Sequence, residues 1–423
     1  MSDILDLFPD SADVADGELT LGGIPASELA GRFGTPLVVL CEETLHARAR
    51  AYTAAAPDAL VAYSVKAFPN VAVIQLLAHE GLGADVSTLG ELAFALRGGM
   101  PGDRIVVHGN NKSEVELAAA ALAGVRFVVL DAEDEIELVS DAGIRRVLVR
   151  VTPGIEVETH EAIRTAHHGS KFGLPPDAAR RAISTARDAG LEVAGLHVHL
   201  GSQVLGTESA LTAVDWAAAF ADECRGELDW TAAVLDLGGG LGIRYVEADR
   251  PPEIRDFVAA LLARVVEEWS ARGLPRPDVI LEPGRSIAGP AGVTLYRAGV
   301  VKRAGDGTAY VAVDGGLADN PRPALYGAPL TAILANRVGE PAAGTFTVAG
   351  RHCESGDVLA VDVELPEPHR GDLVAIPGAG AYTLAMASNY NAVPRPAAVL
   401  VGKGAAREIR RRETIDDLLA LDA

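Results

Sequence analysis

Eight short apolar segments between residues 60 and 284 constrain the fold of this chain more than any other feature of its sequence. Each is rich in valine, leucine, isoleucine or alanine, which is typical of a strand that is buried on both faces of a sheet. The segments are LVAYSV (60–65), LGADVS (82–87), RIVVHG (104–109), RFVVLD (126–131), RRVLVRV (145–151), VAGLHVH (193–199), AVLDLGG (233–239) and DVILEPG (278–284).

The stretches between these segments have the apolar spacing of helices. GELAFALRGG (90–99) and SEVELAAAALAGV (113–125) both place apolar residues at i, i+3 and i+4. Strands that alternate with helices predict a parallel sheet, and eight such units favour a closed (β/α)8 TIM-type barrel over an open doubly wound sheet. We therefore expect an α/β fold with a (β/α)8 barrel, and we assign residues 42–292 to that barrel.

The pattern changes after residue 292. GVTLYRAGVVKRAG (292–305), GTFTVAGRHCESGDVLAV (344–361) and GDLVAIPGAG (371–380) are β-rich segments interrupted by glycines, with little helical periodicity. They predict a C-terminal antiparallel β-domain over residues 293–423, with a helix near its end. Residues 1–41 are short and irregular in pattern, and we expect them to join that β-domain.

Composition excludes some partners. A formal net charge of −21 argues against nucleic acid and anionic membranes, because both would repel the chain. The segment MSDILDLFPD (1–10) lacks the basic start and apolar core of a secretion signal, and no apolar stretch reaches the roughly 18–20 residues of a membrane span. Cys41, Cys224 and Cys353 show no metal-binding spacing. The sequence predicts a cytoplasmic protein without nucleic-acid or membrane partners.

Polar residues gather where the predicted strands end. In (β/α)8 barrels the catalytic groups come from the carboxyl ends of the strands, so these residues are expected to converge on one mouth. They are Lys66, Asp85, Ser87, His108, Asn110, Asn111, His197, His199, Gly201, Ser202, Gly238, Gly239, Gly240, Glu282, Gly284 and Arg285.

Each of these features also has a plainer interpretation. Lys66 alone reads as a solvated surface lysine. His197 and His199 share one face of a strand and would suit a metal, but no third ligand with a matching signature is apparent. The glycine triplet suits either a tight turn or a phosphate cradle. Glu282 and Arg285 would suit a structural ion pair.

Together the features require a phosphate, a reactive amine and an acid that faces a ring. Pyridoxal phosphate meets all three requirements. Its aldehyde forms a Schiff base with a lysine, its phosphate binds glycine amides, and its pyridine nitrogen pairs with a carboxylate.

Nine motifs, in order along the chain, resemble the diaminopimelate decarboxylase family. This family belongs to the fold-type III pyridoxal phosphate enzymes, together with ornithine and arginine decarboxylases and alanine racemase. The resemblance runs from about residue 30 to the C-terminal helix. The motifs are AYSVKAFPN, GADVSTLGELAFAL, HGNNKS, HVHLGSQ, LDLGGGLG, LEPGR, DNPRPALYGA, CESGD and GAYTLAMASNYN.

The resemblance implies a role for each matching residue. The catalytic residues are Lys66 as the Schiff-base lysine, His199 stacked on the cofactor ring, Glu282 facing the pyridine nitrogen and Cys353 as a proton donor. The cofactor-binding residues are Lys66, His199, Glu282, Asp85, Ser202, Gly238, Gly239, Gly240, Pro283, Gly284, Arg285 and Tyr382. Glu91 belongs to the polar residues around Asp85. The substrate-binding residues are Arg285, Arg322, Tyr326, Glu354 and Tyr382. No metal is implied.

The resemblance also implies a reaction and an assembly. Related racemases place an arginine where this chain has Glu282, so the carboxylate favours decarboxylation, here of meso-2,6-diaminopimelate to L-lysine and CO2, the last step of lysine biosynthesis. Family members contribute the cysteine that Cys353 matches from a neighbouring subunit, which implies a head-to-tail homodimer.

Two features depart from the pattern or resist interpretation. Phe68 stands where many relatives have asparagine, and the segment ETHEAIRTAHHGSKFG (158–173) resembles the family's substrate-facing loop without readable contacts. Two alternatives stay open. One is a related decarboxylase for D-ornithine, D-lysine or a pathway-specific diacid, and the other is a catalytically silent homologue that binds the cofactor.

Overall fold

The computed structural model describes residues 2–153, 170–199 and 201–422, and the chain divides into two compact units. Unit 1 contains Met1–Ala47, Ile243–Arg250 and Ile287–Ala423, and unit 2 contains Arg48–Gly242 and Pro251–Ser286.

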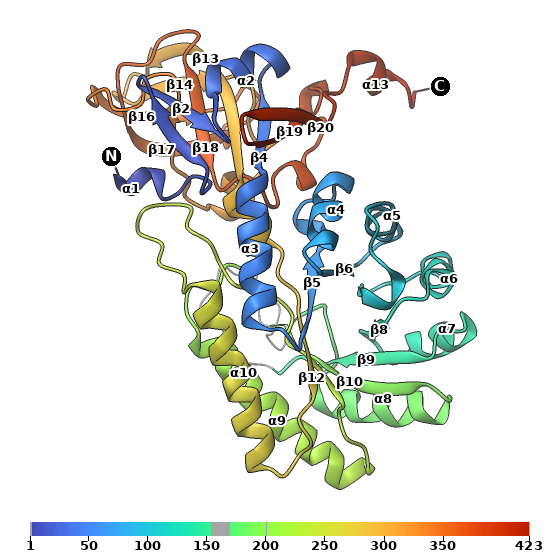
Figure 1. The fold of residues 1–423 in the computed structure, drawn as a ribbon. Coiled ribbons are helices and arrows are strands. Elements are labelled where there is room, and N and C mark those ends of the chain that lie inside the picture. The colour runs from blue at the N-terminus through green and yellow to red at the C-terminus, as the bar shows by residue number, and fades with distance from the viewer. Residues whose placement is uncertain (1, 154–169, 200, 423) are drawn as a thin grey trace. The chain divides into compact units, whose positions relative to one another are not determined.

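Unit 2 is built on a closed barrel of eight parallel strands, which confirms the predicted barrel (Figure 1). All eight predicted segments form its strands. Every strand ends before its predicted segment does, so most of the polar residues follow the strand ends, whereas Asp85 lies within β6 and His197 is the last residue of β10. The strands are β5 (Leu60–Ser64), β6 (Gly83–Val86), β7 (Ile105–Val107), β8 (Phe127–Leu130), β9 (Arg146–Arg150), β10 (Glu192–His197), β11 (Val234–Asp236) and β12 (Asp278–Leu281).

Helices follow the barrel strands along the chain, as the apolar spacing predicts (Figure 1). Side-chain caps fix several of their starts: Asn70 accepts hydrogen bonds from two backbone N–H groups of α4, and Ser113 forms a capping box with Glu116 on α6. The helices are α3 (Glu42–Ala55), α4 (Val71–His79), α5 (Leu89–Arg97), α6 (Glu114–Ala123), α7 (Glu135–Asp141), α8 (Pro176–Asp188), α9 (Glu208–Leu228), α10 (Ile254–Ala271) and α11 (Arg285–Ala288).

Apolar side chains fill the interior of the barrel. The buried cluster comes from seven of the strands, which bury alternate residues toward the centre. Because this layer removes water from beneath the carboxyl ends of the strands, polar groups at those ends rest on an apolar floor. Its members are Leu60, Ala62, Val106, Phe127, Val129, Leu148, Ala194, Val234 and Ile280.

Unit 1 contains the predicted β-domain, with a mixed sheet. Most strand pairs are antiparallel, whereas β14 pairs with β16, and β4 with β19, in parallel. A second sheet, β1–β2–β3, is antiparallel. The strands are β1 (Ala12–Ala15), β2 (Glu18–Leu21), β3 (Ile24–Pro25), β4 (Leu37–Cys41), β13 (Gly292–Arg303), β14 (Ala309–Val313), β15 (Ile333–Leu334), β16 (Gly344–Ala349), β17 (Val358–Leu365), β18 (Leu373–Pro377), β19 (Ala397–Gly402) and β20 (Ala405–Arg410).

Segments distant in sequence complete unit 1. Strand β4 pairs with β13 and β19, and Ile243 and Tyr245 join a hydrophobic cluster with residues of β13, β14, β16, β17 and β18. The helices of this unit are α1 (Ser2–Leu5), α2 (Ala26–Phe33), α12 (Arg322–Tyr326) and α13 (Ile415–Leu419). Within the described residues, we find no helix with the length and apolar character that crossing a bilayer requires.

Candidate active site

Lys66 lies just past the end of β5, in the short turn Val65–Ala67. Its Nζ atom is 3.4 Å from Oδ2 of Asp85, and the same carboxylate oxygen accepts a hydrogen bond from Ser64 Oγ at 2.6 Å. The Lys66 side chain is 46% exposed whereas that of Asp85 is 2% exposed. The amine is therefore oriented by a buried carboxylate and still accessible to a ligand.

Glu282 follows β12 and is buried between two histidines. Its Oε1 is 2.6 Å from Nε2 of His108, and its Oε2 is 3.5 Å from Nε2 of His197. Burial alone would raise the pKa of Glu282, but the charge and hydrogen bond of His108 and the hydrogen bond of His197 hold it well below its usual range. Glu282 is thus a buried carboxylate that contacts histidines rather than Arg285.

The two histidines of the HVH motif are both neutral. Burial lowers the pKa of His197 to about 3, against the opposing hydrogen bond from Glu282. Burial, with the nearby charge of Lys66, also lowers the pKa of His199 well below its ordinary value. Nδ1 of His199 accepts the backbone N–H of Gly239 at 3.2 Å. The remaining proton of the His199 ring therefore sits on Nε2.

The glycine triplet forms a turn that is packed too closely for larger residues. Gly238 has φ +63°, and a Cβ on Gly239 would lie 2.3 Å from the carbonyl oxygen of Glu282. The Gly240 carbonyl accepts the N–H of Val204 at 2.9 Å, which joins the turn to the segment after β10. The turn thus sits between the residues that follow β10 and those that follow β12.

We expect Gly239→Ala to destabilise the protein by roughly 1–3 kcal/mol, because the new Cβ overlaps backbone that cannot move aside freely. Thermal unfolding of the purified variant measures the effect. Gly226→Ala is the matched control: nothing lies within 4 Å of its Cβ position on α9, so it should stabilise by about 0.5–1 kcal/mol. Equal unfolding temperatures for the two variants would contradict the packing argument.

Arg285 lies at the start of α11 and is buried. Its Nη2 donates to Ser202 Oγ at 2.8 Å, and its Nε lies 3.3 Å from the same oxygen. The preceding Pro283 carbonyl accepts the backbone N–H of Ser64 at 3.0 Å, and Gly284 follows it directly. Ser202, Pro283, Gly284 and Arg285 therefore come together through contacts between segments that follow different strands.

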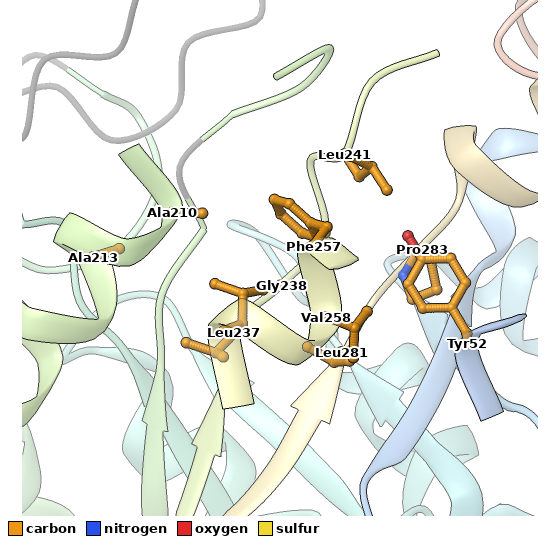
Figure 2. A pocket seen from close by; sticks show the side chains of 12 residues that line it. Tyr52, Ala210, Ala213, Leu237, Gly238, Leu241, Phe257, Val258, Leu281 and Pro283 are labelled. Atoms are coloured by element: carbon orange, nitrogen blue, oxygen red, sulfur yellow. The ribbon is translucent and has the colours of Figure 1, made fainter. Parts of the chain in front are cut away.

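An apolar hollow lies beside the glycine turn (Figure 2). Its only polar side chain is that of Tyr52, whose hydroxyl lies 2.7 Å from Ser286 Oγ. None of the side chains that line it carries a charge. It is lined by Tyr52, Ala210, Ala213, Leu237, Gly238, Gly239, Leu241, Phe257, Val258, Leu261, Leu281 and Pro283.

In unit 1, Arg322 is buried and stacks on aromatic rings. Its guanidinium carbon is 4.1 Å from the ring centre of Tyr245 and 5.7 Å from that of Tyr326. Stacking on the ring faces holds the guanidinium plane while leaving its edge for hydrogen bonds. Tyr382, in the same unit, has φ 57°, a left-handed conformation that a tyrosine adopts only when its surroundings impose it.

Cys353 and Glu354 are exposed on a loop of unit 1 that hydrogen bonds to the neighbouring residues Tyr390 and Asn391 hold in place. The hydroxyl of Tyr390 donates to Oε1 of Glu354, and Oδ1 of Asn391 accepts the backbone N–H of Cys353 at 2.9 Å. Within the loop, Oδ2 of Asp357 accepts the backbone N–H of His352, the residue before Cys353, at 2.7 Å. The thiol and the carboxylate are thus presented side by side in sequence on a supported loop.

Comparison with known proteins identifies the family of this chain. Residues 42–289 match the family described as pyridoxal-dependent decarboxylase, pyridoxal binding domain. A diaminopimelate decarboxylase of Actinosynnema pretiosum is 45% identical over 419 residues, which is 98% of this chain and 94% of that protein. The chain belongs to the diaminopimelate decarboxylase family. The diaminopimelate decarboxylase of Bacillus subtilis is 43% identical over 418 residues, which is 96% of this chain and 95% of that protein.

A solved structure supports the assignment to this family. The diaminopimelate decarboxylase from M. jannaschii, in co-complex with L-lysine, superposes with a TM-score of 0.91 at 34% identity and covers 98% of both chains. The match extends over both units, so the β unit as well as the barrel belongs to the family fold.

The residues of the diaminopimelate decarboxylase barrel fit the family's cofactor, pyridoxal phosphate. Lys66 offers an accessible amine, His199 a neutral flat ring and Glu282 an ionised carboxylate. The glycine turn has no side chains that would keep a phosphate away from its backbone. The fit rests on the chemistry of the groups present.

The sequence pattern does not predict a role for every residue of this site. It places His108 at a strand end without a role, and it does not single out Asp236, a charged residue inside an apolar strand. Tyr390 and Asn391, which hold the loop of Cys353 and Glu354, lie in the SNYN part of a recognised motif. A buried-type strand that contains an aspartate was the one available signal for Asp236.

One predicted segment lies largely outside the described residues. The stretch 158–173, which resembles the family's substrate-facing loop, falls there up to residue 169. Among the described residues of this stretch, Phe172 has the Arg150 guanidinium 4.7 Å above the centre of its ring.

Glu91 lies at the start of α5, where its Oε2 accepts the backbone N–H of Ser87 at 2.7 Å.

Proposed function

We propose that the chain decarboxylates meso-2,6-diaminopimelate and releases L-lysine and CO2, the last step of lysine biosynthesis. The observation that carries the reaction type is the buried Glu282 carboxylate, held between His108 and His197. The names of the relatives and the L-lysine bound to the M. jannaschii protein support the substrate.

The cofactor and the chain divide the chemistry. Pyridoxal phosphate, when bound, supplies a ring that accepts the electron pair left behind as CO2 departs. Glu282 holds a proton at the ring nitrogen, and His108 and His197 keep the carboxylate in position. The ring of His199 would face the cofactor ring, and its orientation is fixed by the Gly239 N–H.

Lys66 would attach the cofactor through Nζ, and the same amine would move protons to and from the substrate. Asp85, 3.4 Å from Nζ, orients the amine. The phosphate would be held beside the glycine turn by the backbone and polar side chains that meet there, with Tyr382 closing the site. These residues are Ser202, Gly238, Gly239, Gly240, Pro283, Gly284, Arg285 and Tyr382.

Substrate binding requires groups for a carboxylate and an ammonium at the far end of the diacid. The buried Arg322 guanidinium, stacked on Tyr245, presents paired N–H donors that match a carboxylate. Glu354 accepts hydrogen bonds from the distal ammonium, and Tyr390 holds its carboxylate in place. Tyr326, Arg285 and Tyr382 complete the substrate contacts.

Glu354→Ala is expected to raise KM for meso-diaminopimelate by roughly 10- to 100-fold, since it removes a charge-assisted hydrogen bond to the substrate. Steady-state kinetics together with cofactor titration measure the effect, and cofactor affinity should stay close to wild type. Glu364→Ala, at an exposed position on β17, is the matched control. Equal losses of cofactor and substrate affinity would show that Glu354 has another role.

Cys353 supports a shared active site. We propose that it protonates the substrate carbon after CO2 has left, acting in the site of a neighbouring subunit of a head-to-tail homodimer. Its exposure within a single chain, on a loop held by Asn391, agrees with this role. A positioned thiol acts as a general acid only when it is held at the reacting carbon.

The compartment is a further part of the proposal. Cys41, Cys224 and Cys353 are all free thiols, as expected for a protein of the reducing cytoplasm. We therefore place the enzyme in the cytoplasm.

A substrate panel tests the proposed function. The purified protein is assayed for CO2 release from meso-diaminopimelate, D-ornithine, L-ornithine, D-lysine, L-lysine and arginine. We expect a clear preference for meso-diaminopimelate, measured as kcat/KM. Preference for one of the other amino acids would overturn the substrate and leave the reaction type in place. Bound cofactor with no CO2 from any of them would instead indicate a catalytically silent homologue.

A further inference from the structure

We propose that Asp236 is a neutral, protonated acid that donates to Glu282 and fixes it against the glycine turn. This makes Asp236 a positioning residue, and its consequence for catalysis rests on the function proposed above. The resemblance to the family implies no role for Asp236, although the residue lies within the motif LDLGGGLG.

Asp236 ends β11 and is fully buried. Its Oδ1 accepts the backbone N–H of Gly238 at 2.9 Å. A carboxylate oxygen of Asp236, a carboxylate oxygen of Glu282 and one ring nitrogen each of His108 and His197 all lie within 4.8 Å of one another. The four titratable side chains therefore share one buried space. Asp236 therefore touches the glycine turn on one side and approaches Glu282 on the other.

The two carboxylates of this cluster have different surroundings. Glu282 contacts two histidines, whereas Oδ2 of Asp236 is buried and accepts no hydrogen bond from the described residues. An ionised Asp236 would be both unsolvated at Oδ2 and close to a second negative charge. A proton on Oδ2 removes both costs, because the resulting O–H can donate to Glu282.

The charges on neighbouring strands support the same assignment. Burial raises the pKa of Asp236 well above its usual range, and the charges of Glu282 and Asp85 raise it further. Arg150 on β9 brings positive charge to the cluster, but its own ion pair is with Asp131, at 3.5 Å. His197 on β10 is neutral, so its side chain adds no charge that would hold Asp236 ionised. His108, which follows β7, directs its Nε2 to Glu282 Oε1 at 2.6 Å, so its charge is paired with Glu282.

A protonated Asp236 has a mechanical consequence. Its carboxyl group accepts from Gly238 and donates to Glu282, so it links the turn proposed to bind the phosphate with the carboxylate proposed to face the ring nitrogen. A shift of either group is transmitted to the other through one short side chain. Asparagine can imitate both hydrogen bonds, whereas alanine can make neither.

The pH dependence of stability tests the proton on Asp236 without any substrate. The unfolded chain releases this proton near the ordinary aspartate pKa of about 3.9, while the folded chain retains it. Between that pH and the raised pKa the unfolded state binds fewer protons, so Asp236 makes the wild-type protein less stable as pH rises. The contribution reaches about a tenfold change in the unfolding equilibrium constant per pH unit.

The experiment compares thermal unfolding of the full-length, cofactor-free chain from pH 4.5 to 7.5. The unfolding temperature of Asp236→Asn, minus that of wild type, is expected to rise with pH. Asp236→Ala should show the same upward trend at a lower absolute stability, so the test survives poor folding of one variant. The exposed Asp103→Asn serves as the control and should show no such rise. A flat or falling difference for both Asp236 variants would overturn the proposal.

Two further measurements separate this proposal from its alternatives. In the loaded enzyme, kcat should fall less for Asp236→Asn than for Asp236→Ala, because asparagine retains both hydrogen bonds; equal losses would overturn the positioning role. Two histidines and two carboxylates also suit a divalent metal. Stoichiometric binding of Zn²⁺ by the cofactor-free chain that is lost in Asp236→Asn would overturn the neutral acid. Neither result depends on which amino acid is the substrate.

Discussion

Lys66→Ala is expected to lower kcat/KM for meso-diaminopimelate by at least about 10³-fold, because no other group can replace a nucleophile at the end of β5. Asp85 would remain to bind a cation, but the chain would have no amine to attach the cofactor. Borohydride reduction followed by mass spectrometry of the chain measures this attachment. Wild type should be labelled at Lys66, and the variant should lose the label together with its activity.

Lys302→Ala is the control, since it removes an equally exposed lysine from β13 and should keep both the label and the activity. A labelled, active Lys66→Ala protein would contradict the assignment. Mixing the inactive Lys66→Ala chain with an inactive Cys353→Ala chain also tests the shared site. Random dimers would restore about a quarter of the sites, because each mixed dimer has one site with both residues intact. No recovery on mixing would exclude the exchange of Cys353 between subunits.

The sequence was sufficient to predict the barrel and the polar residues near the carboxyl ends of its strands, because both depend on local patterns. Each buried parallel strand corresponds to a run of apolar residues in the sequence. A polar residue directly after such a run lies at the carboxyl end of the strand. Lys66, His199 and Glu282 each follow such a run. Their mutual distances are set by strand order and register, and a linear pattern does not contain these.

Contacts between distant segments could not be predicted in this way. Taken alone in the sequence, Glu282 and Arg285 would suit a structural ion pair, yet Glu282 contacts His108 and His197 across the barrel. Likewise, Tyr390 reaches Glu354 over 36 residues of sequence. Side-chain partners of this kind depend on tertiary packing, and only the folded chain reveals them.

The β unit shows the same limit in its backbone. Glycine-broken β segments predict a sheet and favour antiparallel neighbours, because hairpins join strands that follow each other closely. Strand β4, from the N-terminal part of the chain, instead pairs in parallel with β19. Two strands more than 350 residues apart need no hairpin, so their relative direction is free of the local rule that guided the prediction.

Glu282→Gln is expected to lower kcat by roughly 10²- to 10⁴-fold while the cofactor stays attached to Lys66. Glutamine has the same length and can still form hydrogen bonds with His108 and His197, so the barrel end should keep its packing. It carries no negative charge, however, and cannot hold a proton at the ring nitrogen. The loss should appear in kcat rather than in KM, because the interaction grows as CO2 leaves.

Steady-state kinetics and the borohydride label measure the two parts of this prediction separately. Glu223→Gln, at an exposed carboxylate on α9, is the control and should keep the wild-type kcat. A Glu282→Gln enzyme within tenfold of the wild-type kcat would show that the charge of Glu282 is not needed. Because that charge distinguishes this site from an arginine-containing racemase site, such a result would remove the structural reason for assigning decarboxylation.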